Sequence, residues 1–253
     1  MTIISLLLLA SLLPHLTFTA HVNVGIVNGK EAKPHSRPYM VSLQKNKKHF
    51  CGGFLISDYF VLTAAHCLID RNGILTAVVG AHNLKKKNEG SVRIGVKSYH
   101  MHPDYNNKTD LNDIMLLRLE KKKQNKNIKK ISIPEQERDI TADSVCSVTG
   151  WGSLRTNGSA SDRLMETKVF IMDNTECKTR WRNKYSVSKM MCTYGSGGSC
   201  DGDSGGPLVC GDTAVGVTSF GSRKACNSQE LPEVYTKISA YLPWIHSIIA
   251  KFK

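Results

Sequence analysis

The chain is organised around one stretch, Gly198-Ser199-Cys200-Asp201-Gly202-Asp203-Ser204-Gly205-Gly206-Pro207-Leu208-Val209. Glycine adopts positive φ without steric cost, so the backbone can turn tightly here. Such a turn can direct the amides of Gly202 and Ser204 at one point, where a negatively charged oxygen would be stabilised. Ser204 would then be a nucleophile, which needs a base and a group that orients the base. Taken alone, the stretch also fits an ordinary glycine-rich turn.

Two further segments offer the partners that Ser204 would need. His66 lies in Thr63-Ala64-Ala65-His66-Cys67, just after an apolar run, and Asp113 immediately precedes the apolar residues 114–117. A carboxylate that enters a buried strand is costly unless it is hydrogen-bonded. Alone, His66 would be a packed, hydrogen-bonded histidine and Asp113 a strand-start cap. Together with Ser204 they fit a base, an orienter and a nucleophile.

The first residues and the cysteines indicate the compartment. Residues 1–14 are mostly apolar but too few to span a bilayer comfortably, and small and hydroxyl residues follow up to Ala20, so a secretory signal peptide is predicted over 1–20. No later segment is apolar enough for a membrane span. Eight cysteines in an oxidising compartment predict disulfides, with about a hundred pairings open. A metal centre is disfavoured because no C-x-x-C pair occurs.

The net charge is +13, and no Lys, Arg, Asp or Glu precedes Ile26. The lysines gather in three clusters: Lys45, Lys47 and Lys48; Lys85–Lys87; and Lys121–Lys123 with Lys126, Lys129 and Lys130. A charge run is usually a solvated loop. Three such lysine clusters on a secreted chain favour an acidic partner, such as a sulfated glycan or an anionic surface. Nucleic acid is disfavoured, since no recognition helix or zinc module is present.

Short apolar and β-branched runs alternate with turn residues along most of the chain. They predict strands at 39–43, 53–56, 60–63, 75–79, 92–96, 114–119, 144–149, 164–171, 207–210, 214–219 and 233–238. Many short strands with regular punctuation indicate a β-sandwich or barrel. Only residues 239–250 show helical spacing, with Pro243 in the first turns. A lysine-rich link near 120–130 divides the chain into two β halves.

Five motifs occur in an order that resembles trypsin/chymotrypsin-like serine proteases: Ile26-Val27-Asn28-Gly29, TAAHC, Asp113-Ile114-Met115-Leu116, Gly150-Trp151-Gly152 and GDSGGP. Residues 30–40 resemble the start of granzymes, mast-cell chymases and cathepsin G. The resemblance covers essentially all of residues 26–253. It implies an all-β, chymotrypsin-like fold, with two six-stranded antiparallel β-barrels and a C-terminal helix.

The resemblance assigns the chemistry. Ser204 attacks the scissile carbonyl, His66 takes and returns the proton, and Asp113 fixes the histidine tautomer. The amides of Gly202 and Ser204 form the oxyanion hole. The implied activity is that of a serine endopeptidase.

The same resemblance places the substrate on a short segment. Ser219 supports Asp113 and lines the cleft with Phe220 and Gly221, whose backbone pairs with substrate as an extra strand. Phe220 replaces the more usual tryptophan and keeps an aromatic face. Asp201 is expected at the rim of the cleft, where it would favour basic residues on the leaving side of the substrate.

The family pattern also implies how the cysteines pair and how the chain is activated. The pairs are Cys51–Cys67, Cys146–Cys210, Cys177–Cys192 and Cys200–Cys226. Residues 21–25 would be a pro-peptide, and the freed ammonium of Ile26 would insert beside Asp203. Gly25 precedes the cut, which disfavours a trypsin-like activator. Relatives lose their pro-peptide to a dipeptidyl peptidase, but cleavage after Ala20 leaves five residues, an odd number.

In the family that the chain resembles, the primary pocket determines which residue precedes the cleaved bond. Gly198 stands at the position of its floor, where a trypsin has Asp, and Gly221 leaves the entrance open. Glu233 is at the back wall, as in cathepsin G, and its carboxylate could pair with a substrate Lys or meet the edge of an aromatic ring. The predicted P1 preference is Phe, Tyr, Leu or Lys, and an acidic P1 is disfavoured. The alternative is an exposed Glu233 without a role.

The remaining expectations concern modification, partners and rival functions. Asn107 and Asn157 head two N-glycosylation sequons. No cofactor or metal is expected; the expected partners are protein or peptide substrates, a serpin-type inhibitor and a heparin-like proteoglycan. The chain is expected to be a monomer, secreted or stored in granules. One rival function is a non-catalytic cationic granule protein, although His66, Asp113 and Ser204 are all present. The other is a digestive protease.

Overall fold

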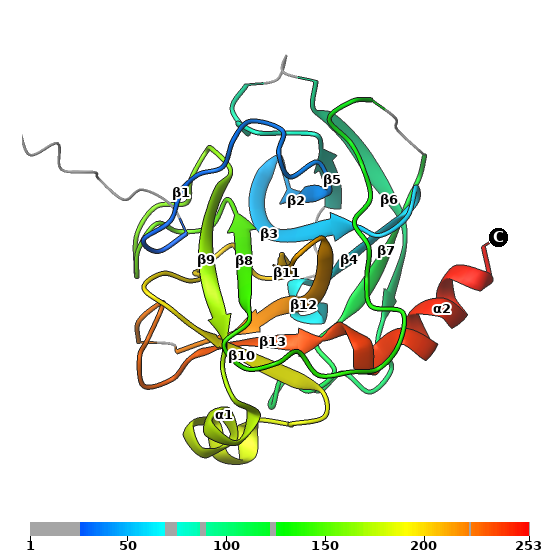
Figure 1. Cartoon of the computed structure of the whole chain (residues 1–253). Coiled ribbons are helices and arrows are strands. Elements are labelled where there is room, and N and C mark those ends of the chain that lie inside the picture. Colours follow the sequence, from blue (N-terminus) through cyan, green and yellow to red (C-terminus); the bar gives the residue numbers. More distant parts are fainter. Residues whose placement is uncertain (1–25, 69–74, 87–89, 122–124, 223, 253) are drawn as a thin grey trace, which may run out of the picture.

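The computed structural model describes residues 26–68, 75–86, 90–121, 125–222 and 224–252. The expected signal peptide, the expected pro-peptide, Lys87, Lys122 and Lys123 lie outside these residues. The described part of the chain folds into two closed six-stranded antiparallel barrels followed by a C-terminal helix (Figure 1). The fold class expected from the sequence is therefore confirmed.

The N-terminal barrel closes in the order β2-β3-β4-β7-β6-β5. Its strands are β2 (Met40–Lys45), β3 (Lys48–Leu55), β4 (Phe60–Thr63), β5 (Leu75–Val79), β6 (Val92–Met101) and β7 (Met115–Leu119). Asn46 and Lys47 join β2 to β3 with φ of 49° and 66°, the positive values that a two-residue hairpin requires. Val41, Leu43 and Leu117 are among the aliphatic side chains that fill the barrel interior.

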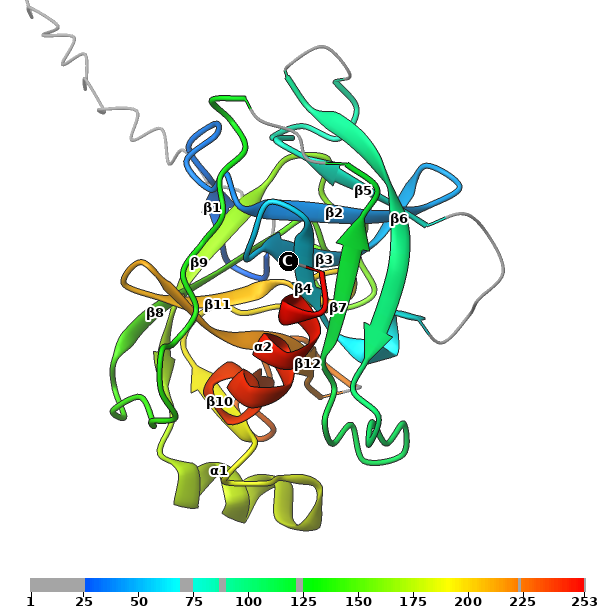
Figure 2. The same cartoon turned by 90° about the vertical axis from the view of Figure 1, so that its right-hand side faces the viewer.

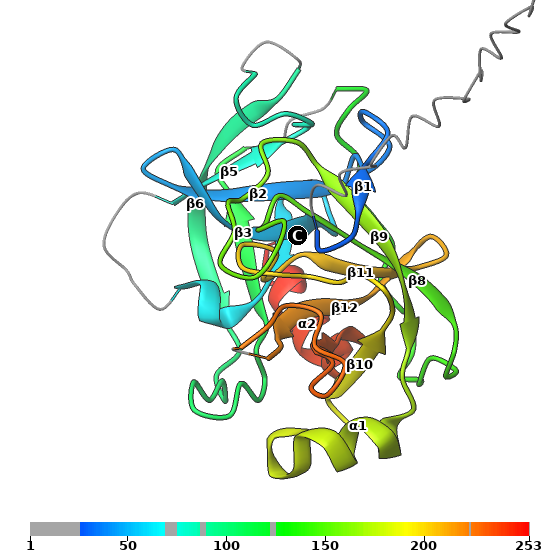
Figure 3. The ribbon, with the colours of Figure 1, turned by 90° about the vertical axis from the view of Figure 1, so that its left-hand side faces the viewer.

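The C-terminal barrel runs β9-β10-β13-β12-β11-β8 and closes because β8 also pairs with β9. Its strands are β8 (Val145–Gly150), β9 (Met165–Ile171), β10 (Met190–Tyr194), β11 (Pro207–Cys210), β12 (Thr213–Phe220) and β13 (Glu233–Lys237). The short strand β1 (Lys30–Glu31) pairs with the first residues of β9, on the edge opposite β8. Figure 3 shows β1 beside β9.

Helical structure is not confined to the end of the chain, and here the prediction is wrong. Helix α1 (Asn174–Trp181) projects from the C-terminal barrel (Figure 1). It buries only Cys177, so it lacks the apolar periodicity that predicts a helix. Its start is fixed instead by Asp173, whose carboxylate accepts hydrogen bonds from the amides of Thr175 and Glu176.

The C-terminal helix joins the two barrels. After a 3₁₀ turn over Ile238–Tyr241, α2 (Leu242–Ala250) starts with Pro243 in its first turn. Ile245 packs into a cluster that also holds Phe54 and Leu116 of the first barrel and Val217 of the second. Figure 2 shows α2 beside strands of both barrels. No helix among the described residues is long and apolar enough to span a membrane. The shared core holds the barrels together, so strand ends from both can meet at one site.

Candidate functional site

His66 and Asp113 lie against each other at the edge of the N-terminal barrel. His66 occupies a 3₁₀ turn (Ala65–Leu68) after β4, and Asp113 immediately precedes Ile114 at the entry to β7. The Nδ1 atom of His66 is 2.7 Å from Oδ2 of Asp113, and its backbone amide donates to Oδ1 at 2.8 Å. Ser219 also donates to Oδ2, at 2.5 Å. Asp113 is fully buried, and three donors compensate its loss of water.

The environment of His66 suits a proton acceptor. Burial lowers the pKa of its imidazole, but the hydrogen bond and charge of Asp113, with a smaller contribution from Asp110, outweigh that effect and raise the pKa above its usual value. With Asp113 holding Nδ1, the Nε2 atom is left to exchange a proton with a reactant.

Ser204 lies where two cavities meet. One, of about 970 Å³, is lined by Ser204 together with His66 and the Cys51–Cys67 disulfide. The other, of about 210 Å³, is lined by Ser204 together with Ser219, Phe220, Gly221 and Glu233. The backbone amide of Gly52 donates to the Ser204 carbonyl at 2.7 Å, which fixes this residue to the first barrel. A substrate chain can therefore pass Ser204 on both sides.

The amides of Gly202 and Ser204 both belong to the turn around Ser204, which requires a positive φ. Gly202 has φ of +94°. The Asp201 carbonyl, which shares a peptide group with the Gly202 amide, accepts a hydrogen bond from the Ser153 amide at 2.7 Å. The Asp203 carbonyl, which shares a peptide group with the Ser204 amide, accepts one from the Gly206 amide at 2.9 Å. In a trans peptide the N–H points away from the C=O, so both amides face the other side of the turn. No pattern in the sequence singled out His49, whose Nε2 donates a hydrogen bond to the Gly202 carbonyl at 3.0 Å.

Asp203 supports the same turn from inside the protein. It is 2% exposed, and its carboxylate accepts hydrogen bonds from the amides of Gly152 and Cys200 at 2.8 Å and 3.0 Å. Burial raises the pKa of Asp203 to about 7. A methyl group at Gly150 or Gly152 would overlap this carboxylate, which explains the two glycines of the Gly-Trp-Gly motif. Ile26 is fully buried among the side chains of this barrel.

Glu233 lies inside the smaller cavity. It is 8% exposed, so the alternative of an exposed glutamate does not hold. Ser199 donates a hydrogen bond to its Oε2 at 3.0 Å, and a methyl group at Gly221 would overlap its carboxylate. Gly198 is buried and faces the Glu233 stem, while Asp201 is exposed on the lining of the cavity. Burial raises the pKa of Glu233 to about 7, with Asp201 adding to the effect.

The remaining predicted positions lie as follows. The structure joins the cysteines as Cys51–Cys67, Cys146–Cys210, Cys177–Cys192 and Cys200–Cys226. Asn107 and Asn157 are both exposed, as glycosylation requires. The described lysines of the three clusters are exposed, except for the half-buried Lys45.

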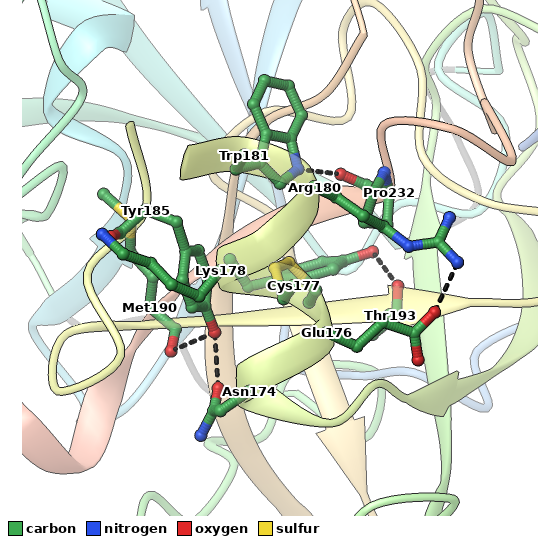
Figure 4. The surroundings of a disulfide bond; sticks show 12 residues. Asn174, Glu176, Cys177, Lys178, Arg180, Trp181, Tyr185, Met190, Thr193 and Pro232 are labelled. Carbon is green, nitrogen blue, oxygen red and sulfur yellow. Dashed lines mark hydrogen bonds and ion pairs between the residues drawn. A yellow bond between two sulfur atoms is a disulfide. The ribbon is translucent and has the colours of Figure 1, made fainter. Parts of the chain in front are cut away.

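Sequence reasoning missed an aromatic and charged group beside Phe220. Trp181, the last residue of α1, donates from its indole N–H to the carbonyl of Pro232 at 3.0 Å (Figure 4). Its ring packs edge-on against Phe220 with 5.0 Å between centroids. Lys184 and Asp110 complete the group and line the same cavity as Ser204. Their contact joins distant parts of the chain, so no local pattern could indicate it.

Comparisons with known proteins agree with this geometry. A family model described as Trypsin matches residues 26–245. Granzyme E of Mus musculus is 42% identical over 234 residues, which cover 87% of this chain and 89% of that protein. Duodenase-1 of Bos taurus is 40% identical over 234 residues, covering 90% of both. The structure of neuropsin, a serine protease expressed in mouse brain, is 32% identical with a TM-score of 0.82, covering 88% of this chain and all of that one.

Proposed function

The chain belongs to the trypsin family and is a serine endopeptidase, and on that premise we propose that Ser204, His66 and Asp113 are its catalytic triad. The observation that carries the proposal is the position of the His66–Asp113 pair on the cavity that also holds Ser204.

The arrangement supports acyl transfer in two steps. Ser204 Oγ attacks the carbonyl carbon of the scissile peptide bond while His66 Nε2 takes its proton, and the amides of Gly202 and Ser204 stabilise the oxyanion. His66 then gives the proton to the leaving amine, and the C–N bond breaks. Water, deprotonated by His66, attacks the acyl-enzyme and releases Ser204 with its proton restored. Asp113 holds the imidazole and stabilises its charged form.

Active-site titration tests this assignment. The chain is produced with Ile26 at its N-terminus and treated with a serine-directed phosphonate. One phosphonate group per chain, attached at Ser204 and absent from Ser204→Ala, is the expected result. Attachment elsewhere, together with turnover by Ser204→Ala, would contradict the triad.

The P1 preference follows from the interior of the smaller cavity. Gly198 adds neither charge nor bulk, and Glu233 offers a buried carboxylate. An ionised Glu233 would bind a P1 Lys by a charge-assisted hydrogen bond, and Phe, Tyr or Leu would occupy the apolar remainder. A peptide library varied only at P1 tests this preference: turnover after both Lys and aromatic residues is expected. Turnover after aromatic residues alone would leave Glu233 without the proposed role.

Activation would depend on Asp203. A buried carboxylate at a site with no cation is strongly unfavourable, and the ammonium of a freed Ile26 would supply one. The proposed organisation is a signal peptide over 1–20, a pro-peptide over 21–25 and a protease domain over 26–253, with its internal boundary near 120–130. N-terminal sequencing of the active protein tests the cut: Ile26 is expected as the first residue.

The exposed lysines support the proposed partners and location. A secreted or granule-stored enzyme with Lys47, Lys48 and Lys85 at its surface would bind a heparin-like proteoglycan, with loss of binding as salt rises. A serpin-type inhibitor and a monomeric state complete the proposal. Heparin-column elution of the folded protein tests the glycan: elution at the salt concentration of a neutral protein would contradict it.

A cationic protein without catalysis is the second candidate, and the net charge of +13 is the observation that favours it. The two candidates differ in one result. No phosphonate attachment and no peptide turnover, despite a free Ile26 N-terminus, would favour the binding protein over the protease.

A further inference from the structure

An ion pair bridges the two barrels over the cavity that holds Ser204. Asp110 belongs to the loop between β6 and β7, and Lys184 to the 3₁₀ turn (Arg182–Lys184) that follows α1. The Nζ atom of Lys184 lies 3.2 Å from Oδ2 of Asp110, and both side chains line the cavity with Ser204 and Glu233. The pair thus stands on the acyl side of the site, where the substrate residues before the scissile bond must lie.

Each charge has a distinct second neighbour. Asp110 lies three residues before Asp113, which holds His66, and it lines the cavity with Ser204, so it stands on the His66 side of the pair. Its charge also contributes to the raised pKa of the His66 imidazole. Lys184 lies 4.4 Å from the centre of the Phe220 ring and 5.7 Å from that of Trp181, and is therefore at the aromatic end of the cleft. Figure 4 shows Trp181 anchored to Pro232 at the end of α1. Asp110 is therefore the member of the pair nearer to His66 in the fold, and Lys184 is the member beside Phe220 and Trp181.

A bound peptide would meet these charges at alternate residues. An extended substrate that pairs with residues 219–221 directs successive side chains to opposite faces. With P1 in the cavity beside Glu233, the P2 and P4 side chains share the other face, about 7 Å apart. P2 is closer to the scissile bond than P4 and would lie nearest Asp110, whereas P4 would lie nearest Lys184 and Phe220.

Resting on the proposed function, we propose that Asp110 and Lys184 determine specificity by selecting a basic P2 residue and an acidic P4 residue. A basic P2 side chain would then face the Asp110 carboxylate, and an acidic P4 side chain would face the Lys184 ammonium. The side chains of Asp110 and Lys184 are 21% and 32% exposed, so a substrate can reach both. A partly exposed pair is held weakly, so it yields to substrate charges at little cost. The opposite substrate charges would meet like charges at both positions.

Four peptides test the proposal. They share Phe at P1 and one neutral residue at P3, and they carry Lys or Glu at P2 combined with Glu or Lys at P4. With Ile26 freed at the N-terminus, the P2-Lys, P4-Glu peptide is expected to have the highest kcat/KM and its charge-reversed counterpart the lowest, about tenfold apart. The difference should shrink as ionic strength rises.

Variants of Asp110 and Lys184 show which residue selects which substrate position. Each variant is assessed by the ratio of kcat/KM between peptides that differ at P2 or at P4. Asp110→Asn should abolish the P2 discrimination and keep that at P4, and Lys184→Gln should do the reverse. Exchanging the charges, with Asp110→Lys and Lys184→Asp together, should invert the order. The Arg37–Glu166 ion pair has similar exposure and lies outside the cavity, so Arg37→Gln and Glu166→Gln are the matched controls and should keep the wild-type order.

Three results would overturn the inference. The first is equal turnover of all four peptides, and the second is discrimination that survives in both single variants. If the peptides are cleaved but the charges at P2 and P4 make no difference, this inference is wrong and the proposed function still holds. The third is failure of every peptide, with no phosphonate on Ser204, which overturns the proposed function and this inference with it.

Discussion

Asp113 and Glu233 are both buried carboxylates of one site, yet their surroundings differ. Asp113 accepts hydrogen bonds from the amide of His66 and from Ser219, and it faces the imidazole that it orients. Glu233 has the Ser199 hydroxyl and a backbone hydrogen bond at Asn227, and burial raises its pKa to about 7. The first carboxylate is compensated before substrate arrives. The negative charge of Glu233 is only partly compensated by the protein, so a substrate cation can provide the remaining stabilisation.

The largest effect should come from removing the charge of Asp113. Asp113→Asn keeps the shape but favours the wrong imidazole tautomer, so kcat should fall about 10⁴-fold for Lys and Phe substrates alike. Steady-state kinetics with one substrate of each kind measures this. A fall confined to one substrate would contradict the assignment of Asp113 to catalysis.

Removing Glu233 should separate the two roles. Glu233→Gly removes the counter-charge of a P1 Lys, so kcat/KM for the Lys substrate should fall about 100-fold, while the Phe substrate is spared. The same pair of substrates measures it. Equal losses for both substrates would show that Glu233 supports the fold of the pocket and does not read P1.

Ser219 should affect both substrates equally, unlike Glu233, because its hydroxyl donates a hydrogen bond to Asp113. Ser219→Ala deletes one hydrogen bond to a buried carboxylate, and kcat/KM should fall about tenfold for both substrates. The ratio between Lys and Phe turnover should stay at its wild-type value. A changed ratio would place Ser219 in P1 selection instead.

The smallest effect is a pH dependence. Glu233 is neutral below its pKa of about 7 and charged above it, so the Lys/Phe ratio of kcat/KM should rise with pH, about threefold between pH 6.5 and 7.5. Asp201 also disfavours ionisation of Glu233, whereas the hydrogen bonds from Ser199 and at the Asn227 backbone favour it. Titration of His66 affects both substrates and cancels from the ratio. In Glu233→Gln the ratio should not change with pH.

The sequence predicted the parts of the molecule whose signals are local. The glycines around Ser204, the position of Asp113 before an apolar run, and the alternating strands each depend on a few neighbouring residues. Helix α1 was missed because a single buried residue, Cys177, gives no periodicity. The Asp110–Lys184 pair joins residues far apart in the chain, and the Ser199–Glu233 hydrogen bond does the same. Such contacts follow only from the closed barrels.

The pairing of β1 with β9 has a consequence for activation. Lys30 and Glu31 are held opposite Glu166 and Met165, and the Val27 carbonyl accepts a hydrogen bond from the Gly198 amide, so after the proposed cut the new amine is at most four residues from a fixed strand. Four residues reach at most about 14 Å. So short a tether keeps the amine beside the C-terminal barrel, at an effective concentration of roughly millimolar or more for the proposed ion pair with Asp203. Insertion of the Ile26 amine beside Asp203 would therefore be a unimolecular step that does not depend on the enzyme concentration. A separate peptide would compete with this amine only at a concentration close to the effective concentration of the tethered amine.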